Sequence, residues 1–248
     1  MKTPIRNPHG ATKANKVIEE IIPVGSVVST YGFYSGEVEF NLSNRDRLVS
    51  SYTSKKSIYE FWQTIFEDPN PTAEIASRIL PLRDEKEFSV LQERWHLFKN
   101  PDVRSALFFL LNNCSSTGYI SKGAMDIKNY NPVSLSRLKK FIKPKHHHLT
   151  LIEDSLSHMQ SNDKSDYIFI QLEKYKLEML TEGINRGPEE EYFVFRRVLE
   201  TLEEKRSIIL TKPSKMLREE KNYGIIYIDK YGNKTTETGA QEMILYNE

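Results

Sequence analysis

Ser26-Val-Val-Ser-Thr-Tyr31 is a short run of β-branched and aromatic residues that is flanked by turn residues. Asp166-Tyr-Ile-Phe-Ile170 and Ser207-Ile-Ile-Leu-Thr211 have the same character. Runs of this length and composition are typical of buried strands. We therefore predict three strands here, and they decide the fold class because helical patterns lie between and after them.

Apolar residues recur at helical spacing in seven longer segments. These segments are Lys13–Ile22, Ile58–Phe66, Ala73–Leu80, Glu85–Phe98, Val103–Asn112, Ser134–Phe141 and Glu189–Lys205. Strands that alternate with helices indicate an α/β protein. Near the end of the sequence, Tyr223–Lys230 and Gln241–Tyr246 predict an antiparallel pair of strands.

The middle of the sequence differs from its flanks. Residues 57–112 carry four helical patterns and hardly any strand pattern, whereas the strand patterns lie on either side. We interpret this block as an insertion. The expected organisation is an α/β core of residues 1–54 and 136–248, with a helical and hairpin insertion of residues 55–135.

Composition excludes several classes of protein. The longest apolar stretches fall far short of the roughly 18 residues that span a bilayer, and the first residues lack the apolar run of a secretion signal. The single cysteine, Cys114, cannot form an internal disulfide, so we expect no membrane partner and a cytoplasmic location. With 35 basic and 34 acidic residues, any attraction to nucleic acid must come from a local patch.

Three consecutive histidines, His146-His-His148, follow Lys143-Pro-Lys145. Neighbouring side chains of a strand or helix point in different directions, so three in a row cannot all bind one metal. We interpret residues 143–148 as a positively charged linker. The other histidines have no cysteine or carboxylate at ligand spacing, and we expect no metal.

Ala106-Leu-Phe-Phe-Leu-Leu-Asn-Asn-Cys-Ser-Ser-Thr-Gly118 combines an apolar helix with a polar turn, and Asn131-Pro-Val-Ser-Leu-Ser-Arg-Leu138 follows it. Together these segments resemble a stretch of the Dam-like DNA N6-adenine methyltransferases. In that family an apolar helix precedes Asn-Arg-x-Ser-Phe-Ser-Gly, a glycine-bearing hairpin and a Ser-x-x-Arg-Leu helix start.

Other segments resemble further family motifs and occur in the family's order. They are Asn7–Lys13, Tyr31–Phe40, Val49–Trp62, Asp166–Tyr175 and Ala240–Asn247. The resemblance covers essentially the whole chain. It implies an α/β fold with a Rossmann-like S-adenosylmethionine-dependent methyltransferase sheet and a mainly helical insertion that, in the family, helps to recognise target DNA.

The resemblance also identifies positions where the catalytic motif is degenerate. In the family a strand leads into Asp-Pro-Pro-Tyr, whose acceptors activate the amine of a flipped adenine and whose ring stacks on the base. The corresponding positions here are Gln171, Leu172, Glu173 and Lys174, with Tyr175 one place late. A shift of one residue restores the ring but puts Leu172 at the acid position, so neither register gives a working site.

The positions that the resemblance assigns to the cofactor have changed as well. They are His9, Gly10, Tyr34, Gly36, Thr53 and Asp154. Tyr34 replaces the first of two loop glycines, where a side chain would fill the ligand's volume, and Thr53 replaces the acid that would hold the ribose. Asp154 either matches a family acid or is a solvated loop carboxylate. We expect no cofactor, unless an active enzyme retains S-adenosylmethionine.

Basic residues cluster beside the expected recognition hairpin. They are Lys122, Lys128, Arg137, Lys139, Lys140, Lys143 and Lys145. A solvated helix face explains such a cluster as well as contact with DNA phosphates does.

Three hypotheses follow from the sequence. The first is a degenerate DNA adenine N6-methyltransferase homologue, catalytically inactive, that acts as a DNA-binding or regulatory module with double-stranded DNA, an active methyltransferase or another protein as its partner. The second is a divergent active enzyme that uses Gln171 or Glu173 as the acceptor. The third is a structural or assembly protein that reuses the fold.

Overall fold

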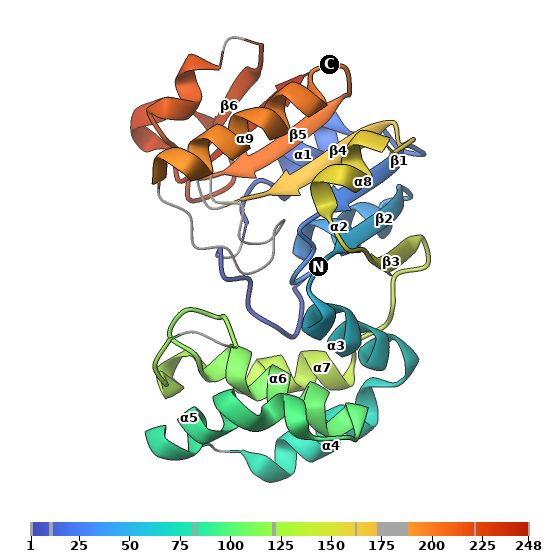
Figure 1. Cartoon of the computed structure of the whole chain (residues 1–248), viewed down its shortest axis with the longest axis vertical. Helices are drawn as coiled ribbons and strands as arrows, with labels where there is room; N and C mark the ends of the chain where they lie inside the picture. Colours follow the sequence, from blue (N-terminus) through green and yellow to red (C-terminus); the bar gives the residue numbers. More distant parts are fainter. Residues whose placement is uncertain are drawn as a thin grey trace. The chain divides into compact units, whose positions relative to one another are not determined.

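The computed structural model describes residues 2–9, 12–80, 82, 84–120, 123–161, 163–172, 188–220 and 222–247 (Figure 1). The chain forms two compact units. The helical unit consists of Met1–Ala11, Ser35–Glu37 and Ser57–Lys143, and the sheet unit consists of Thr12–Tyr34, Val38–Lys56 and Pro144–Glu248. The helical unit therefore runs to Lys143, whereas the sequence suggested an insertion of residues 55–135.

A mixed, eight-stranded sheet forms the centre of the sheet unit. Its strands are β1 (Val27–Tyr31), β2 (Leu48–Thr53), β3 (His147–Leu151), β4 (Tyr167–Gln171), β5 (Ser207–Thr211), β6 (Gly224–Ile228), β7 (Lys234–Thr235) and β8 (Glu242–Asn247), in the order β3-β2-β1-β4-β5-β8-β6-β7. The strands β1 to β5 are parallel, and β8 is antiparallel to both β5 and β6. The order changes direction between β1 and β4, which makes this point a topological switch point.

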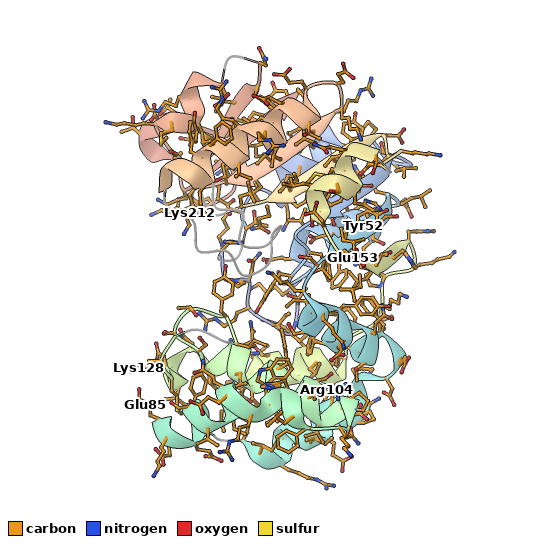
Figure 2. The ribbon with its side chains drawn as sticks, viewed as in Figure 1. Tyr52, Glu85, Arg104, Lys128, Glu153 and Lys212 are labelled. Atoms are coloured by element: carbon orange, nitrogen blue, oxygen red, sulfur yellow. The ribbon has the colours of Figure 1, made fainter. Side chains whose placement is uncertain are left out.

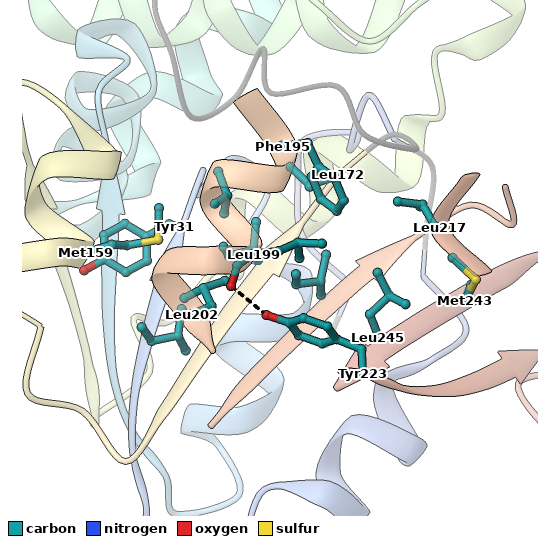
Figure 3. Packing of buried hydrophobic residues seen from close by; sticks show 14 residues of the cluster. Tyr31, Met159, Leu172, Phe195, Leu199, Leu202, Leu217, Tyr223, Met243 and Leu245 are labelled. Carbon is teal, nitrogen blue, oxygen red and sulfur yellow. Dashed lines mark hydrogen bonds between the residues drawn. The ribbon is translucent and has the colours of Figure 1, made fainter. Parts of the chain in front are cut away.

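Helices pack on both faces of the sheet. In the described ranges these are α1 (Asn15–Ile21), α2 (Glu37–Ser43), α8 (Ser155–Ser161) and α9 (Pro188–Leu202). On one face, Val28 of β1 packs in a cluster with residues of α1 and α2. On the other face, Tyr31 packs in a cluster with Met159 of α8 and Phe195 of α9 (Figure 3). The expected α/β fold class is confirmed at this level.

The first helix of the sheet unit is capped by a distant carboxylate. Glu242 of β8 accepts hydrogen bonds through Oε2 from the backbone N–H groups of Lys13 (2.9 Å) and Ala14 (3.0 Å). The Thr12 hydroxyl donates a third bond of 3.1 Å. The N–H groups at a helix start have no partner within the helix, so Glu242 stabilises the start of α1 from the other end of the chain.

The helical unit is built on α3 (Lys56–Glu67), α4 (Pro69–Ile79), α5 (Glu85–Arg94), α6 (Pro101–Cys114) and α7 (Pro132–Lys139), with short helices at Trp95–Leu97 and Ile127–Asn129. Phe61 of α3 stacks on Phe108 of α6 with 4.8 Å between ring centroids. Trp62 lies 5.3 Å from the ring of Phe141. These rings form an aromatic core. No helix of the described ranges is long and apolar enough to cross a membrane.

One interpretation from the sequence is wrong. Residues 143–148 are not simply a linker, because His147 and His148 begin β3 and pair in parallel with Val49 and Ser50. The side chain of His147 is buried and that of His148 is exposed, as the alternation of a strand requires. The strand was missed because β-branched and aromatic residues are scarce in it.

Candidate functional site

The carboxyl edge of the sheet is where an α/β protein holds its ligands, at the switch point of the strand order. In this chain β1 and β4 flank that point. The chain order places five expected site positions at or directly after strand ends on this edge. They are Tyr34 after β1, Thr53 at the end of β2, Asp154 after β3, Gln171 at the end of β4 and Leu172 after it.

The turn between β1 and α2 carries buried aromatic side chains. Tyr34 is 7% exposed and Phe33 is fully buried. Gly32 and Gly36 have φ of +74° and +73°, a conformation that glycine adopts at no steric cost. Tyr34 has no such φ, since Asp46 is the sole non-glycine residue with positive φ in the described ranges. The backbone therefore accepts a tyrosine at this position without strain.

Thr53 and Asp154 both serve local structure. Thr53 is fully buried and its hydroxyl accepts a bond of 3.2 Å from the Lys55 N–H. Asp154 precedes α8 and its Oδ2 accepts a bond of 2.8 Å from the Ser157 N–H. Burial acts to raise the pKa of Asp154, but hydrogen bonds from Ser157 and the Leu156 N–H outweigh it and lower the pKa. The carboxylate thus stays charged and caps a helix, which fits the loop-carboxylate alternative.

The degenerate catalytic positions lie partly in the core. Gln171 is half-buried and pairs with Leu210 of β5. Leu172 is 2% exposed, and its N–H donates a 2.9 Å bond to the Leu210 carbonyl. Figure 3 shows its side chain beside Phe195 of α9. Leu172 is therefore a core residue. The other three positions, Glu173, Lys174 and Tyr175, lie outside the described residues.

His9 belongs to the helical unit, and Gly10 lies outside the described residues. The segment that contains His9 is attached to the end of α6. Asn112 accepts a 2.7 Å bond from the Arg6 N–H through Oδ1 and donates a 3.0 Å bond to the Arg6 carbonyl through Nδ2. Asn113 Nδ2 donates a bond of 3.2 Å to the Pro4 carbonyl. The residues that directly precede the Asn7–Lys13 motif are thus in contact with the end of α6.

Three of the candidate DNA-binding residues lie together at one helix end. Arg137 and Lys139 occupy the last turn of α7, and Lys140 is its C-cap. Cations at this end also stabilise the helix, because the carbonyl groups there carry partial negative charge. This cluster of basic residues is therefore compatible with two roles, stabilisation of the end of α7 and contact with DNA phosphates.

The other four candidate DNA-binding residues are not part of α7 or its cap. Lys128 is exposed in the short helix Ile127–Asn129 (Figure 2). The Lys143 ammonium lies 4.9 Å above the Phe66 ring, and Lys145 is exposed in the sheet unit. Lys122 lies outside the described residues.

A polar cluster that the sequence did not predict lies between β1, β2 and α8. The Tyr31 hydroxyl donates a 2.7 Å bond to Asp163 Oδ2 and lies 2.9 Å from His158 Nδ1. The Tyr52 ring stacks on Tyr31 with centroids 5.0 Å apart and lies 4.4 Å from the His158 ring. Figure 2 labels Tyr52 within this region of the sheet unit. Burial, and then the hydrogen bond to Asp163, raise the pKa of Tyr31, so its hydroxyl stays protonated.

Two surface hollows lie along α9, with volumes of about 220 and 450 Å³. Their lining is charged and shares Glu200. Two of the lining acids have partners: Tyr192 and Arg196 contact Glu220, and Asn222 donates to Glu203. None of the expected site residues lines either hollow.

Neither a metal centre nor a reactive thiol is found in the described part of the chain. No group of three His, Cys, Asp or Glu side chains there is arranged to hold a metal. Cys114 is fully buried, and burial raises the pKa of its thiol to about 11. Because the thiolate is the nucleophilic form, burial holds the Cys114 thiol in its less reactive, protonated form.

Comparisons with known proteins provide no evidence about the family or function of this chain. No protein-family model matches the chain, and no curated protein matches it. Among solved structures, an X-ray structure described as precorrin 8W decarboxylase from Methanobacterium thermoautotrophicum matches with 11% identity and a TM-score of 0.40, over 100% of this chain and 96% of that chain. A likeness at that level supports no conclusion about fold family or function.

Proposed function

We propose that this protein is a catalytically inactive relative of the Dam-like DNA adenine methyltransferases that acts as a DNA-binding or regulatory module. One observation carries the proposal. At three positions where the family would bind cofactor or target base, the fold buries uncharged side chains of its own. These are Tyr34 (7% exposed), Thr53 (0%) and Leu172 (2%).

The sheet supports the relationship to methyltransferases. The resemblance implies a Rossmann-like sheet, and the doubly wound order of parallel strands in Rossmann folds begins 3-2-1-4-5. The strands β1 to β5 follow this order, and the antiparallel β8 lies between β5 and β6. A fold supports many activities, so the proposed loss of catalysis rests on the side chains.

The chemistry of methyl transfer explains why these side chains matter. The target amine needs a hydrogen-bond acceptor beside it, and the base must enter an open pocket. Leu172 offers no acceptor and packs inside the cluster with Phe195. Gln171 retains an amide oxygen but lacks the negative charge of an aspartate. We therefore propose that neither position supports catalysis.

Isothermal titration calorimetry with S-adenosylmethionine tests the inactive cofactor site. We expect no binding heat at millimolar ligand. Stoichiometric binding, together with transfer of labelled methyl groups to DNA that Gln171→Ala abolishes, would establish the active alternative instead.

DNA binding is tested separately, by fluorescence anisotropy with a labelled duplex between 50 and 200 mM salt. We expect weaker binding at higher salt, because neutralised phosphates release counterions. In the double variant Lys139→Ala/Lys140→Ala, the slope of log K against log salt should become less negative by about 1 for each of the two lysines that binds a phosphate. Lys16→Ala changes an exposed lysine of α1 in the sheet unit and serves as the control. Absence of salt-dependent binding, with a stable protein complex, would favour the assembly hypothesis.

A further inference from the structure

We propose that the outer strand of the sheet, β3, pairs with β3 of a second copy of this chain. Among the described residues β3 lies at one edge of the sheet and pairs only with β2. The opposite edge is formed by β7, which has two residues, whereas β3 has five. Proteins prevent pairing at an edge by making the strand very short, and a longer exposed edge is a template for another strand. The edge at β3 is therefore the one suited to accept a further strand.

The backbone of β3 has an inner side, toward β2, and an outer side. The His146 carbonyl and the Ile152 N–H both form hydrogen bonds with β2, of 2.9 and 3.0 Å. Successive residues of a strand direct their N–H and C=O groups to opposite sides. Counting in twos between these residues, the backbone groups of Thr150 face β2, while those of Leu149 and Leu151 face the outer side. The outer side thus presents backbone groups to a second strand.

Symmetry limits how two copies of β3 can pair. In a two-fold dimer, a residue that contacts another is matched by the reverse contact. In an antiparallel pair the residues that face outward must oppose one another, because these exchange N–H···O=C bonds. The register with Leu149 opposite Leu149 of the second copy meets this condition and uses all of β3, since His147 then opposes Leu151. The two Leu149 residues exchange two backbone hydrogen bonds, and the two sheets become continuous.

The charges that flank β3 favour a second copy as the occupant. Exposed Lys145 lies two residues before the strand, and exposed Glu153 lies two residues after it (Figure 2). In the register above, Lys145 of each copy lies opposite Glu153 of the other, so the interface contains this pair twice. Opposite charges across an antiparallel pair attract, whereas like charges destabilise it. A lysine at an edge usually deters pairing, but here the glutamate at the other end of the strand compensates for it.

The side chains of β3 fit the same register. Leu151 is 40% exposed at the end of the strand. It lies on the same face of the sheet as Leu149, because the two are two residues apart. In the dimer Leu151 is diagonal to Leu149 of the second copy, a separation that a long side chain can bridge. Pairing therefore covers an apolar side chain that is exposed in the single copy, which the hydrophobic effect favours.

Sedimentation velocity of the full chain between about 1 and 200 μM tests the proposal, a range that covers micromolar dissociation constants. We expect a weak, reversible monomer–dimer equilibrium, because small interfaces are typical of weak complexes. Lys145→Glu should weaken the dimer by roughly tenfold or more, since it makes both charge pairs repulsive. The double variant Lys145→Glu/Glu153→Lys restores opposite charges and should return the dissociation constant to within about threefold of the wild-type value. Lys16→Glu makes the same change of charge on α1 and is the control, with no effect expected.

Hydrogen exchange of the wild-type protein, followed by NMR, locates the contact without any variant. The Leu149 N–H faces outward in the single copy and is hydrogen-bonded in the dimer, so its protection should increase with protein concentration. The Thr150 N–H faces β2 in both states, and its protection should not depend on concentration. The two neighbouring amides thus separate pairing at the outer edge from a general change in the stability of the sheet.

Three results would overturn the proposal. A chain that stays monomeric over this range of concentration would leave the edge to a strand of another protein. A dimer that Lys145→Glu does not weaken would place the contact elsewhere on the surface. So would a dimer in which protection of Leu149 is independent of concentration.

Discussion

The hydroxyl of Tyr31 and the carboxylate of Asp163 are joined by a 2.7 Å hydrogen bond, which links the end of β1 to the loop before β4. Asp163 also accepts bonds through Oδ1 from the Ser165 N–H (2.8 Å) and hydroxyl (2.6 Å). Burial acts to raise the pKa of Asp163, but the bonds from Ser165 and Tyr31 lower it. The carboxylate therefore contributes to stability as an anion.

The first prediction is an acid-dependent loss of stability at Asp163. Because its pKa is lowered on folding, the contribution is present above the unfolded pKa of about 3.9 and is lost as the pH falls through the folded value. Asp163→Ala leaves the Tyr31 hydroxyl without this acceptor and should cost about 1–3 kcal/mol at pH 7. Urea unfolding at pH 7 and pH 3 measures both effects. The exposed Glu153→Gln is the control, and equal losses in the two variants would contradict the prediction.

The second prediction concerns Arg47, which is 5% exposed. Its guanidinium donates to the carbonyls of Glu19 and Ile22 at the end of α1, at 2.9 and 2.6 Å. Arg47→Met keeps an unbranched side chain with an apolar stem but removes these bonds, and should lower the free energy of unfolding by about 3 kcal/mol. Arg45 forms a surface ion pair with Glu19 at 3.9 Å. Arg45→Met should therefore change the free energy of unfolding by less than about 1 kcal/mol. Similar changes in the free energy of unfolding for Arg47→Met and Arg45→Met would contradict the proposal that buried Arg47 caps α1.

The third prediction tests whether Leu172 is a residue of the hydrophobic core or faces an open site. If this residue is part of the core, Leu172→Ala should cost about 2–5 kcal/mol in unfolding free energy. Leu48→Ala removes the same atoms from a side chain that is 49% exposed and should cost much less. Thermal unfolding followed by circular dichroism gives the comparison. A neutral Leu172→Ala would mean that this position faces an open site.

The fourth prediction compares two glycines with positive φ. At Gly232 (φ +91°) an added Cβ would lie 2.8 Å from the Lys13 carbonyl oxygen, whereas at Gly25 (φ +84°) it would meet nothing within 4 Å. Gly25→Ala should cost about 1–2 kcal/mol for the strained backbone alone. Gly232→Ala adds a steric clash and should cost more in the same unfolding assay. The reverse order would show that the turn at Gly232 can move.

Much of the sheet could be predicted because its central strands are apolar. All five residues of β5 are buried, so its β-branched run is visible in the sequence. The inward positions of β2 and β3 include Ser51, Thr53 and His147, whose polarity hides the pattern. Neither α2 nor α8 was predicted, and each has seven residues, which is about two turns of helix.

The candidate site was predictable only in part. Strand ends place Thr53 and Gln171 on one sheet edge, and the sequence could indicate both. The cluster of Tyr31, His158 and Asp163 joins residues 127 and 132 positions apart. No spacing rule can find such a cluster, because its members come together only when the sheet forms.

The cap that Glu242 provides for α1 has a consequence for the order of folding during synthesis. On the ribosome, α1 emerges more than 200 residues before the carboxylate that satisfies its first N–H groups. The strand that carries Glu242 also fills the gap between β5 and β6. The sheet unit therefore reaches its native stability only after residue 242 has left the exit tunnel, and a stalled or truncated chain would expose apolar sheet surface to chaperones and proteases.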